Sequence, residues 1–225
     1  MNFVDVWLTA EGIPRKSLVR FSGDVNYIEA AYYAGLPKRL NLRRDRVFRF
    51  VVNACPKKRT PPYGRFENNG EVVEIFRAFD FAKYWKLSDP VARKNVALDF
   101  MQKGVEAICK RLAVNPRPFR KAYRSVKAGP AFYCYAATKA QYNPNRSLRA
   151  YLEVKYIPGI GSIFAVFEDV RSKLSKRVRV WKGIPSYVVV SSLIGKTRWR
   201  GQNILVILPR LRGKALVARA PRFDS

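Results

Sequence analysis

Two patterns of side chains in this 225-residue chain could take part in chemistry. The first is a Glu-x-Lys sequence, which is one part of the site that some metal-dependent nucleases use. One class of nuclease uses a Glu-x-Lys with an upstream Asp, in which the carboxylates hold Mg²⁺ and the Lys steadies the attacking water. Glu153 and Lys155 form such a fragment in a predicted strand, but no acidic residue lies between Glu106 and Glu153. Alternating charges on the exposed side of a strand explain the fragment more simply.

The residue types that the chain lacks also argue against catalysis. It has no histidine, which removes Ser-His-Asp and Cys-His arrangements, His-ligated zinc and the usual general base for RNA cleavage. No Ser-x-x-Lys occurs to replace them. The three dispersed cysteines, Cys55, Cys109 and Cys134, fit neither a disulfide framework nor a zinc site. We therefore expect a non-enzymatic protein without metal or cofactor, in a reducing intracellular compartment.

The second pattern is a set of clusters of Arg and Lys that suit phosphate binding. Four clusters lie within residues 43–49, 57–65, 117–127 and 173–179, and further cations follow towards the C-terminus. Arg provides bidentate phosphate contacts and stacks on bases. The residues expected to contact nucleic acid are Arg43, Arg44, Arg46, Lys57, Lys58, Arg59, Arg117, Arg120, Lys121, Arg124, Lys173, Lys176, Arg177, Arg179, Lys196, Arg198, Trp199, Arg200, Arg210 and Arg212.

Aromatic residues near these cations are candidates for stacking on bases. Trp199 stands between Arg198 and Arg200 in what we expect to be a loop, where the ring can stack a base while the guanidinium groups hold its phosphates. Tyr133, Tyr135 and Tyr142 are further candidates, although alternate aromatics on a strand more often pack in a core.

The overall charge favours a polyanionic partner. The formal net charge is +28, and residues 170–223 hold fourteen Lys or Arg without one Asp or Glu. Residues 1–106 carry +7 and residues 107–225 carry +21, so the C-terminal half is expected to do most of the binding. A nucleic acid neutralises such a surface and releases condensed counterions in doing so. We expect a structural RNA-binding protein of a ribosomal or viral genome-associated type.

Two other partners would use the same charges. A basic protein-binding module could dock an acidic protein, for example to neutralise a toxin or inhibit an enzyme. Peripheral binding to an anionic membrane, as in a matrix protein, would require an amphipathic basic helix. The long predicted helix is only mildly basic, so this partner ranks third. The N-terminus does not have the pattern of a signal peptide, and no apolar stretch approaches the length of a membrane span.

The elements that must position these residues predict an α+β fold. Residues 3–8 and 17–21 are expected to form a strand hairpin, followed by a short helix over 25–34 and strands over 46–54 and 71–80. A long amphipathic helix is predicted at about 89–113, with Leu98, Met101, Val105, Ile108 and Leu112 on its core face. Its opposite face carries Lys94, Gln102, Lys103 and Lys110, which we expect to be solvated or part of the basic surface.

The C-terminal part of the chain consists of short apolar runs broken by Pro and Gly. These runs predict strands over 131–138, 148–157, 162–170, 177–181, 187–193 and 203–208, in an antiparallel meander or small barrel. Residues 158–161 are expected to be a hairpin turn. The predicted organisation is a mixed region over 1–113, a basic Pro-containing linker over 114–130 and a strand-rich, strongly basic region over 131–225, unless all three form one continuous domain.

Overall fold

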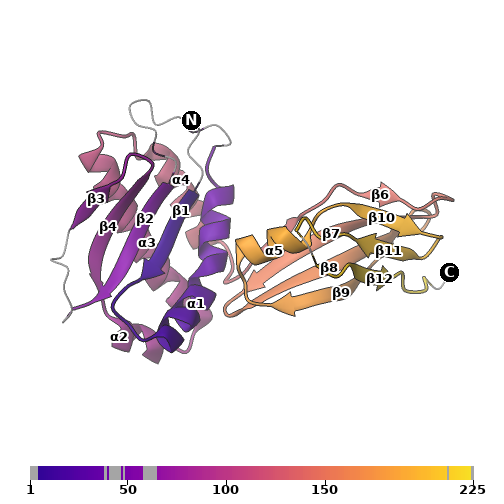
Figure 1. Cartoon of the computed structure of the whole chain (residues 1–225), viewed down its shortest axis with the longest axis horizontal. Coiled ribbons are helices and arrows are strands. Elements are labelled where there is room, and N and C mark those ends of the chain that lie inside the picture. The colour runs from indigo at the N-terminus through magenta and orange to yellow at the C-terminus, as the bar shows by residue number, and fades with distance from the viewer. Residues whose placement is uncertain are drawn as a thin grey trace. The chain divides into compact units, whose positions relative to one another are not determined.

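The computed structural model describes residues 5–37, 40, 47, 49–57, 65–211 and 213–223, which form two compact units over 1–132 and 133–225. The first unit has a mixed sheet and a long helix, and the second has antiparallel sheets (Figure 1). The predicted α+β class is confirmed. The strands that the structure describes do not close into a barrel.

The sheet of the first unit has the order β1-β2-β4-β3. Its strands are β1 (Asp5–Ala10), β2 (Arg49–Pro56), β3 (Phe66–Asn68) and β4 (Val72–Phe79). β1, β2 and β4 are parallel, and β3 runs antiparallel to β4. One face is strongly apolar, because Leu8, Phe50, Val52 and Ile75 are all nearly or completely buried.

Helices α1 (Arg15–Ala34), α2 (Phe81–Lys86), α3 (Pro90–Arg111) and α4 (Arg117–Ala128) complete this unit. The Asp89 carboxylate begins α3 by accepting hydrogen bonds from the backbone of Val91 and Ala92, as expected of an N-cap. The predicted core face of α3 is buried, except that Leu112 lies just past the helix end and is only half-buried. Gly104 brings α3 directly against Val52 of β2.

The predicted hairpin over 3–8 and 17–21 is wrong. Residues 17–21 belong to the first turns of α1, which extends over twenty residues. Phe21, Val25, Ile28 and Tyr32 recur at spacings of three and four and are all completely buried. The helical period already includes Phe21, at the end of the predicted strand, and it continues to Tyr32, so residues 15–34 form one helix.

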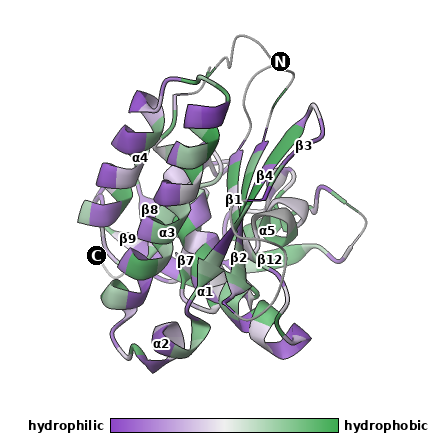
Figure 2. Ribbon diagram, turned by 90° about the vertical axis from the view of Figure 1, so that its left-hand side faces the viewer, coloured by the Kyte–Doolittle hydropathy of each residue, from purple (hydrophilic) through white to green (hydrophobic). Residues whose placement is uncertain are grey.

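Residues 114–130, expected to be a linker, instead contain helix α4, which packs against α1 and α3. Phe119, Ala122 and Val126 form its buried face, and the ring of Phe119 stacks on Phe50 at 5.4 Å. Pro118 lies in the first turn, where its missing N–H has no helical partner to lose. Figure 2 shows hydrophilic and hydrophobic residues alternating along α4.

The second unit contains two antiparallel sheets. The larger sheet consists of β5 (Tyr133–Ala136), β6 (Gln141–Tyr142), β7 (Leu148–Ile157), β8 (Ile160–Asp169) and β9 (Ser175–Gly183), with β5 and β6 both pairing with β7. The smaller sheet has β10 (Thr197–Arg200), β11 (Ile204–Ile207) and β12 (Leu216–Arg219). The expected turn between β7 and β8 is present, with Gly159 at a φ of 76°.

The core of the second unit lies on one face of the larger sheet. Leu152, Ala165 and Phe167 are completely buried there, and the ring of Trp199 from the smaller sheet packs edge-on against Phe167 at 5.8 Å. Residues 187–193, predicted to be a strand from their Val-rich sequence, form helix α5 (Tyr187–Leu193) instead. The backbone N–H of Ile194 closes the last turn of this helix on the Val190 carbonyl.

Candidate nucleic-acid interface

The basic residues of α4 lie on the side of the helix that faces away from its buried residues. We call Arg117, Lys121 and Arg124 the α4 cluster. All three side chains are exposed, and none has an ion-pair partner within the part of the chain that the structure describes. Helix α4 therefore presents three charges that the described protein does not neutralise.

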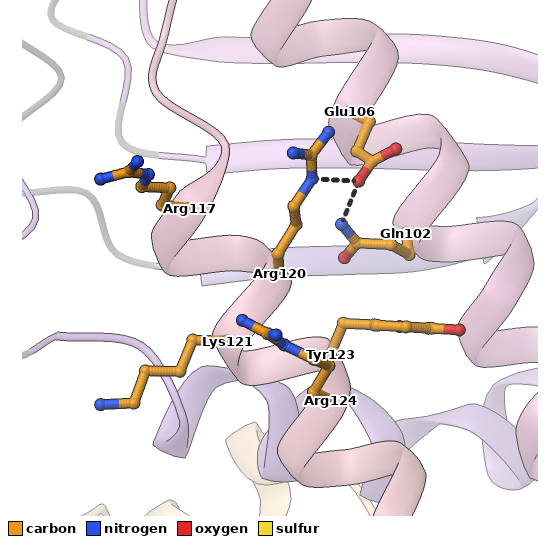
Figure 3. A pocket seen from close by; sticks show the side chains of 7 residues that line it. All are labelled: Gln102, Glu106, Arg117, Arg120, Lys121, Tyr123 and Arg124. Carbon is orange, nitrogen blue, oxygen red and sulfur yellow. Dashed lines mark hydrogen bonds and ion pairs between the residues drawn. The ribbon is translucent and has the colours of Figure 1, made fainter.

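The α4 cluster lines an open groove of about 610 Å³ between α3 and α4 (Figure 3). The groove is lined by Gln102, Glu106, Arg117, Arg120, Lys121, Tyr123 and Arg124. Arg117 and Lys121 point away from the Glu106 carboxylate. The wall of the groove is thus predominantly basic, with one aromatic ring.

One further cation in the groove is held by an acidic residue. The Arg120 guanidinium donates to Glu106 Oε1 at 2.8 Å, and Gln102 Nε2 donates to the same oxygen at 3.1 Å. The hydrogen bond from Arg120 lowers the pKa of Glu106, so this carboxylate stays ionised. Gln102 is itself fixed because Tyr32 donates to its amide oxygen at 2.7 Å. Arg120 is therefore oriented by the protein.

Lys94 corrects the sequence interpretation of α3. It was expected on a solvated or basic face, yet its exposed fraction is only 1%. Its ammonium donates to the carbonyls of Val126 and Lys127, both at 3.1 Å, and to that of Gly129. Burial lowers the pKa of Lys94. A cation in this position adds a charged donor to carbonyls at the helix end, of which Val126 also accepts from the Gly129 N–H at 3.2 Å. It complements the negative end of the helix dipole, so Lys94 anchors the C-terminus of α4.

Asp99 of α3 also holds the C-terminal end of α4, through hydrogen bonds to two of its side chains. Asp99 of α3 accepts hydrogen bonds from the Tyr123 hydroxyl at 2.7 Å and from the Lys127 ammonium at 2.8 Å. The hydrogen bond to Asp99 raises the pKa of Lys127. Tyr123 and Lys127 are therefore engaged within the protein, in contrast to the α4 cluster.

The larger sheet of the second unit turns a charged face away from the core. Strand register places the side chains of alternate residues on this side, where Ser162 and Val166 are buried and Tyr151 and Phe164 are half-buried. The larger polar and aromatic side chains of this side are Tyr142, Arg149, Tyr151, Glu153, Lys155, Phe164, Glu168, Arg177, Arg179 and Lys182. We call this set the open sheet face. Tyr142 is 53% exposed, and the side chain of Arg177 is 58% exposed.

Acidic residues on the open sheet face orient arginines. Arg149 donates to both carboxylate oxygens of Glu168, at 2.7 and 2.8 Å, and Arg177 donates to Glu153 at 3.1 Å. Burial, and to a smaller extent the Glu153 carboxylate, raises the pKa of Cys134 to about 11, so this thiol stays protonated. The two glutamates hold Arg149 and Arg177 in place on the sheet.

The remaining described carboxylate of the second unit closes a turn. Asp169 accepts hydrogen bonds from the backbone of Arg171 at 3.0 Å and of Ser172 at 2.7 Å, and these bonds lower its pKa. Every acidic residue that the structure describes in this unit is thus occupied locally. Exposed cations such as Arg179 and Lys182 have no ion-pair partner among the described residues.

The unit boundary changes the predicted distribution of charge. Residues 1–132 hold 26 basic and 12 acidic side chains, and residues 133–225 hold 18 and 4. Each unit therefore carries a formal net charge of +14. The expected excess in the C-terminal half arose because the five cations of α4 and the two in the last turn of α3 were counted with the strands that follow, whereas both helices belong to the first unit.

Trp199 does not lie on the loop that the sequence suggested. Residues 197–200 form strand β10, and the Trp199 ring faces inward, where its Nε1 donates to the Gln141 carbonyl at 3.3 Å. Arg198 and Arg200 point to the other side and are exposed. The cations of this segment are available, but its aromatic ring packs within the unit.

The other predicted contacts are dispersed. Lys176 donates to the Arg222 carbonyl at 2.5 Å and lies on the opposite side of β9 from Arg177 and Arg179. Lys57, Lys173, Lys196 and Arg210 are exposed at turns or strand ends. The predicted residues that lie outside the described part of the chain are Arg43, Arg44, Arg46, Lys58, Arg59 and Arg212.

The tyrosine candidates separate into two kinds. Tyr133 and Tyr135 stack on each other at 5.4 Å on the core side of the larger sheet, where both are half-buried. Tyr142 lies on the open sheet face beside Arg149. Tyr151 and Phe164 were not among the predicted contacts, although the two-residue period of β7 and β8 was the signal that would have placed them opposite the core residues.

Comparison with protein-family models, with curated proteins and with solved structures gave no match. Within the described residues, no helix is long and apolar enough to cross a membrane. No group of three or more potential metal ligands occurs in the same part of the chain.

Proposed function

We propose that this protein is a non-enzymatic nucleic-acid-binding protein, with RNA as the favoured ligand, in a reducing intracellular compartment. The observation that carries the proposal is the α4 cluster, in which Arg117, Lys121 and Arg124 stand exposed along one anchored helix. Such cations bind phosphates and release their counterions, which makes affinity strongly dependent on salt.

The anchoring of α4 supports a binding surface in preference to a merely solvated helix. Lys94 and Asp99 hold the C-terminal end of α4, and Phe119 packs its first turn on the sheet. The α4 cluster is thereby presented on a fixed element, so less conformational entropy is lost when a ligand binds. Phosphates spaced along a nucleic-acid backbone match cations that recur on one helix face.

A charge-removal variant tests the proposal. The triple variant Arg117→Gln, Lys121→Gln, Arg124→Gln removes three phosphate contacts. The plot of log association constant against log salt concentration should therefore become less steep, by about 2–3 in the magnitude of its slope. At about 0.1 M salt this corresponds to a loss of affinity of roughly 100-fold or more. Fluorescence anisotropy with a labelled RNA over a salt series measures both quantities.

The matched control removes the same formal charge from other helices of the unit. Lys16→Gln, Lys83→Gln, Lys86→Gln changes three exposed lysines on α1 and α2. We expect its salt slope to stay close to that of the unchanged protein. The proposal fails if the unchanged protein binds RNA weakly at low salt, if its affinity barely responds to salt, or if polyglutamate competes as well as RNA.

A further inference from the structure

The open sheet face combines aromatic rings with arginines in a regular arrangement. Tyr142 of β6 lies opposite Arg149 of β7, and Phe164 of β8 lies opposite Arg179 of β9. Tyr151 of β7 lies opposite Val166, whose partner on β9 is Arg177. Each of the three rings therefore has an arginine within one or two strands of it, on the same face.

The three rings follow a diagonal across neighbouring strands. Tyr151 is two residues along β7 from the partner of Tyr142, and Phe164 is two residues along β8 from the partner of Tyr151. Diagonal neighbours on one face of an antiparallel sheet lie about 7–8 Å apart. Successive bases in a strand of duplex DNA are only about 3.4 Å apart. Rings at this spacing match bases that have been separated from one another.

We propose that the open sheet face binds single-stranded nucleic acid, with bases stacked on Tyr142, Tyr151 and Phe164 and phosphates held by the neighbouring arginines. This inference rests on the proposed function and assigns the kind of nucleic acid to a site other than the α4 cluster. A duplex keeps its bases stacked inside and cannot offer them to these rings, whereas a single strand can.

The arginines that form ion pairs on the open sheet face are placed to hold phosphates next to the rings. The Glu168 carboxylate holds Arg149 next to Tyr142, and Glu153 holds Arg177 in the row of Tyr151. Arg177 remains 58% exposed despite its ion pair, so its guanidinium still reaches solvent and a phosphate. Arg179, beside Phe164, has no ion pair within the described residues. The face offers both oriented and free cations around its rings.

Binding of two labelled probes to the full chain tests the inference: an oligouridine of about 12 nucleotides and an RNA duplex of similar length. Each of Tyr142→Leu, Tyr151→Leu and Phe164→Leu keeps an apolar side chain but removes the flat ring. We expect each change to weaken oligouridine binding about fivefold or more, with duplex binding unchanged within about twofold. The difference persists at high salt, because stacking is not screened as phosphate contacts are.

The conservative variants Tyr151→Phe and Phe164→Tyr separate loss of stacking from loss of folding. They retain a ring, so we expect oligouridine affinity close to that of the unchanged protein. The inference is overturned if the leucine variants bind oligouridine as the unchanged protein does, or if they weaken duplex binding equally. Those results leave the proposed function standing, whereas failure of the unchanged protein to bind either probe removes the proposed function itself.

Discussion

Replacing Lys94 by Met tests how α4 is held in the first unit. The substitution keeps most of the side-chain length but removes the ammonium that donates to three carbonyls at the end of α4. The bond to Val126 is buried, and a hydrogen bond to a charged group contributes about 1.5–3 kcal/mol, although the Gly129 N–H still donates to this carbonyl at 3.2 Å in the variant. The bonds to Lys127 and Gly129 are only part-buried, so water replaces much of what they contribute.

We expect Lys94→Met to lower the free energy of unfolding of the first unit by about 2–3 kcal/mol. Part of the loss is offset, because the variant no longer has to bury a charge. Lys103 provides the matched control, since it is exposed on the same helix. Lys103→Met is expected to change stability by less than about 0.5 kcal/mol.

Urea denaturation followed by circular dichroism measures the change in stability, and hydrogen exchange with mass spectrometry locates it. Amides of residues 117–128 are expected to exchange faster in Lys94→Met, while those of the second unit keep their protection. The anchoring role of Lys94 is refuted if the two Met variants unfold at the same urea concentration, or if protection of α4 is unchanged.

Two further predictions concern the same unit. Burial raises the pKa of Glu29 to about 8, so the folded protein keeps a proton that the unfolded chain loses above its ordinary pKa of 4.5. The free energy of unfolding therefore falls as pH rises from about 4.5 to 8, by at most about 1.4 kcal/mol per pH unit. In Glu29→Gln the amide oxygen can still accept the hydrogen bond from the Leu8 N–H, but the side chain no longer titrates. We expect urea denaturation at several pH values to show a smaller dependence on pH in this variant. In Gly104→Ala, the new Cβ would lie 2.5 and 2.6 Å from the methyl carbons of Val52, so we expect the free energy of unfolding to fall by about 1–3 kcal/mol. The fall should be smaller when Gly104→Ala is introduced into a Val52→Ala background, and an equal fall in both backgrounds would contradict the contact.

The long helix α3 illustrates what the sequence could predict. Leu98, Met101, Val105 and Ile108 repeat with the period of a helix, and Asp89-Pro90 marks its start, so local signals agreed with the packing. The strands β7 and β8 were predictable for the same reason, since their alternation and the Gly159 turn are local features. Both elements are determined mainly by residues near each other in the chain.

Other elements depend on contacts that a local pattern does not contain. Residues 187–193 are rich in β-branched side chains, yet they form α5, because such propensities are weaker than the packing of a buried residue such as Val190. Lys94 looked like a surface residue because its partners lie more than thirty residues later in the chain. Pro116 and Pro118 suggested a break in structure, whereas Pro116 is the N-cap of α4 and Pro118 lies in its first turn.

The sequence predicted the residues of the candidate site better than it predicted their positions. Arg117, Lys121 and Arg124 were expected as phosphate ligands, and the structure gathers them on one groove. The stacking surface was expected around Trp199, which packs inward against Phe167. The alternation of β7 and β8 was enough to place Tyr151 and Phe164 opposite the core residues, but which rings and arginines lie side by side across the strands is known only from the register.

The ion pairs of the open sheet face also bear on how this surface tolerates mutation. Lys and Arg are numerous there, so the loss of any one free cation, such as Lys182, changes the total attraction to a polyanion only by a small step. The open sheet face has only two acidic residues, Glu153 and Glu168, and each orients one arginine. Neutral drift is therefore expected to alter the number of positive charges freely while sparing the two negative ones. If this face binds nucleic acid as proposed, its two acidic residues are expected to tolerate substitution less well than its free cations.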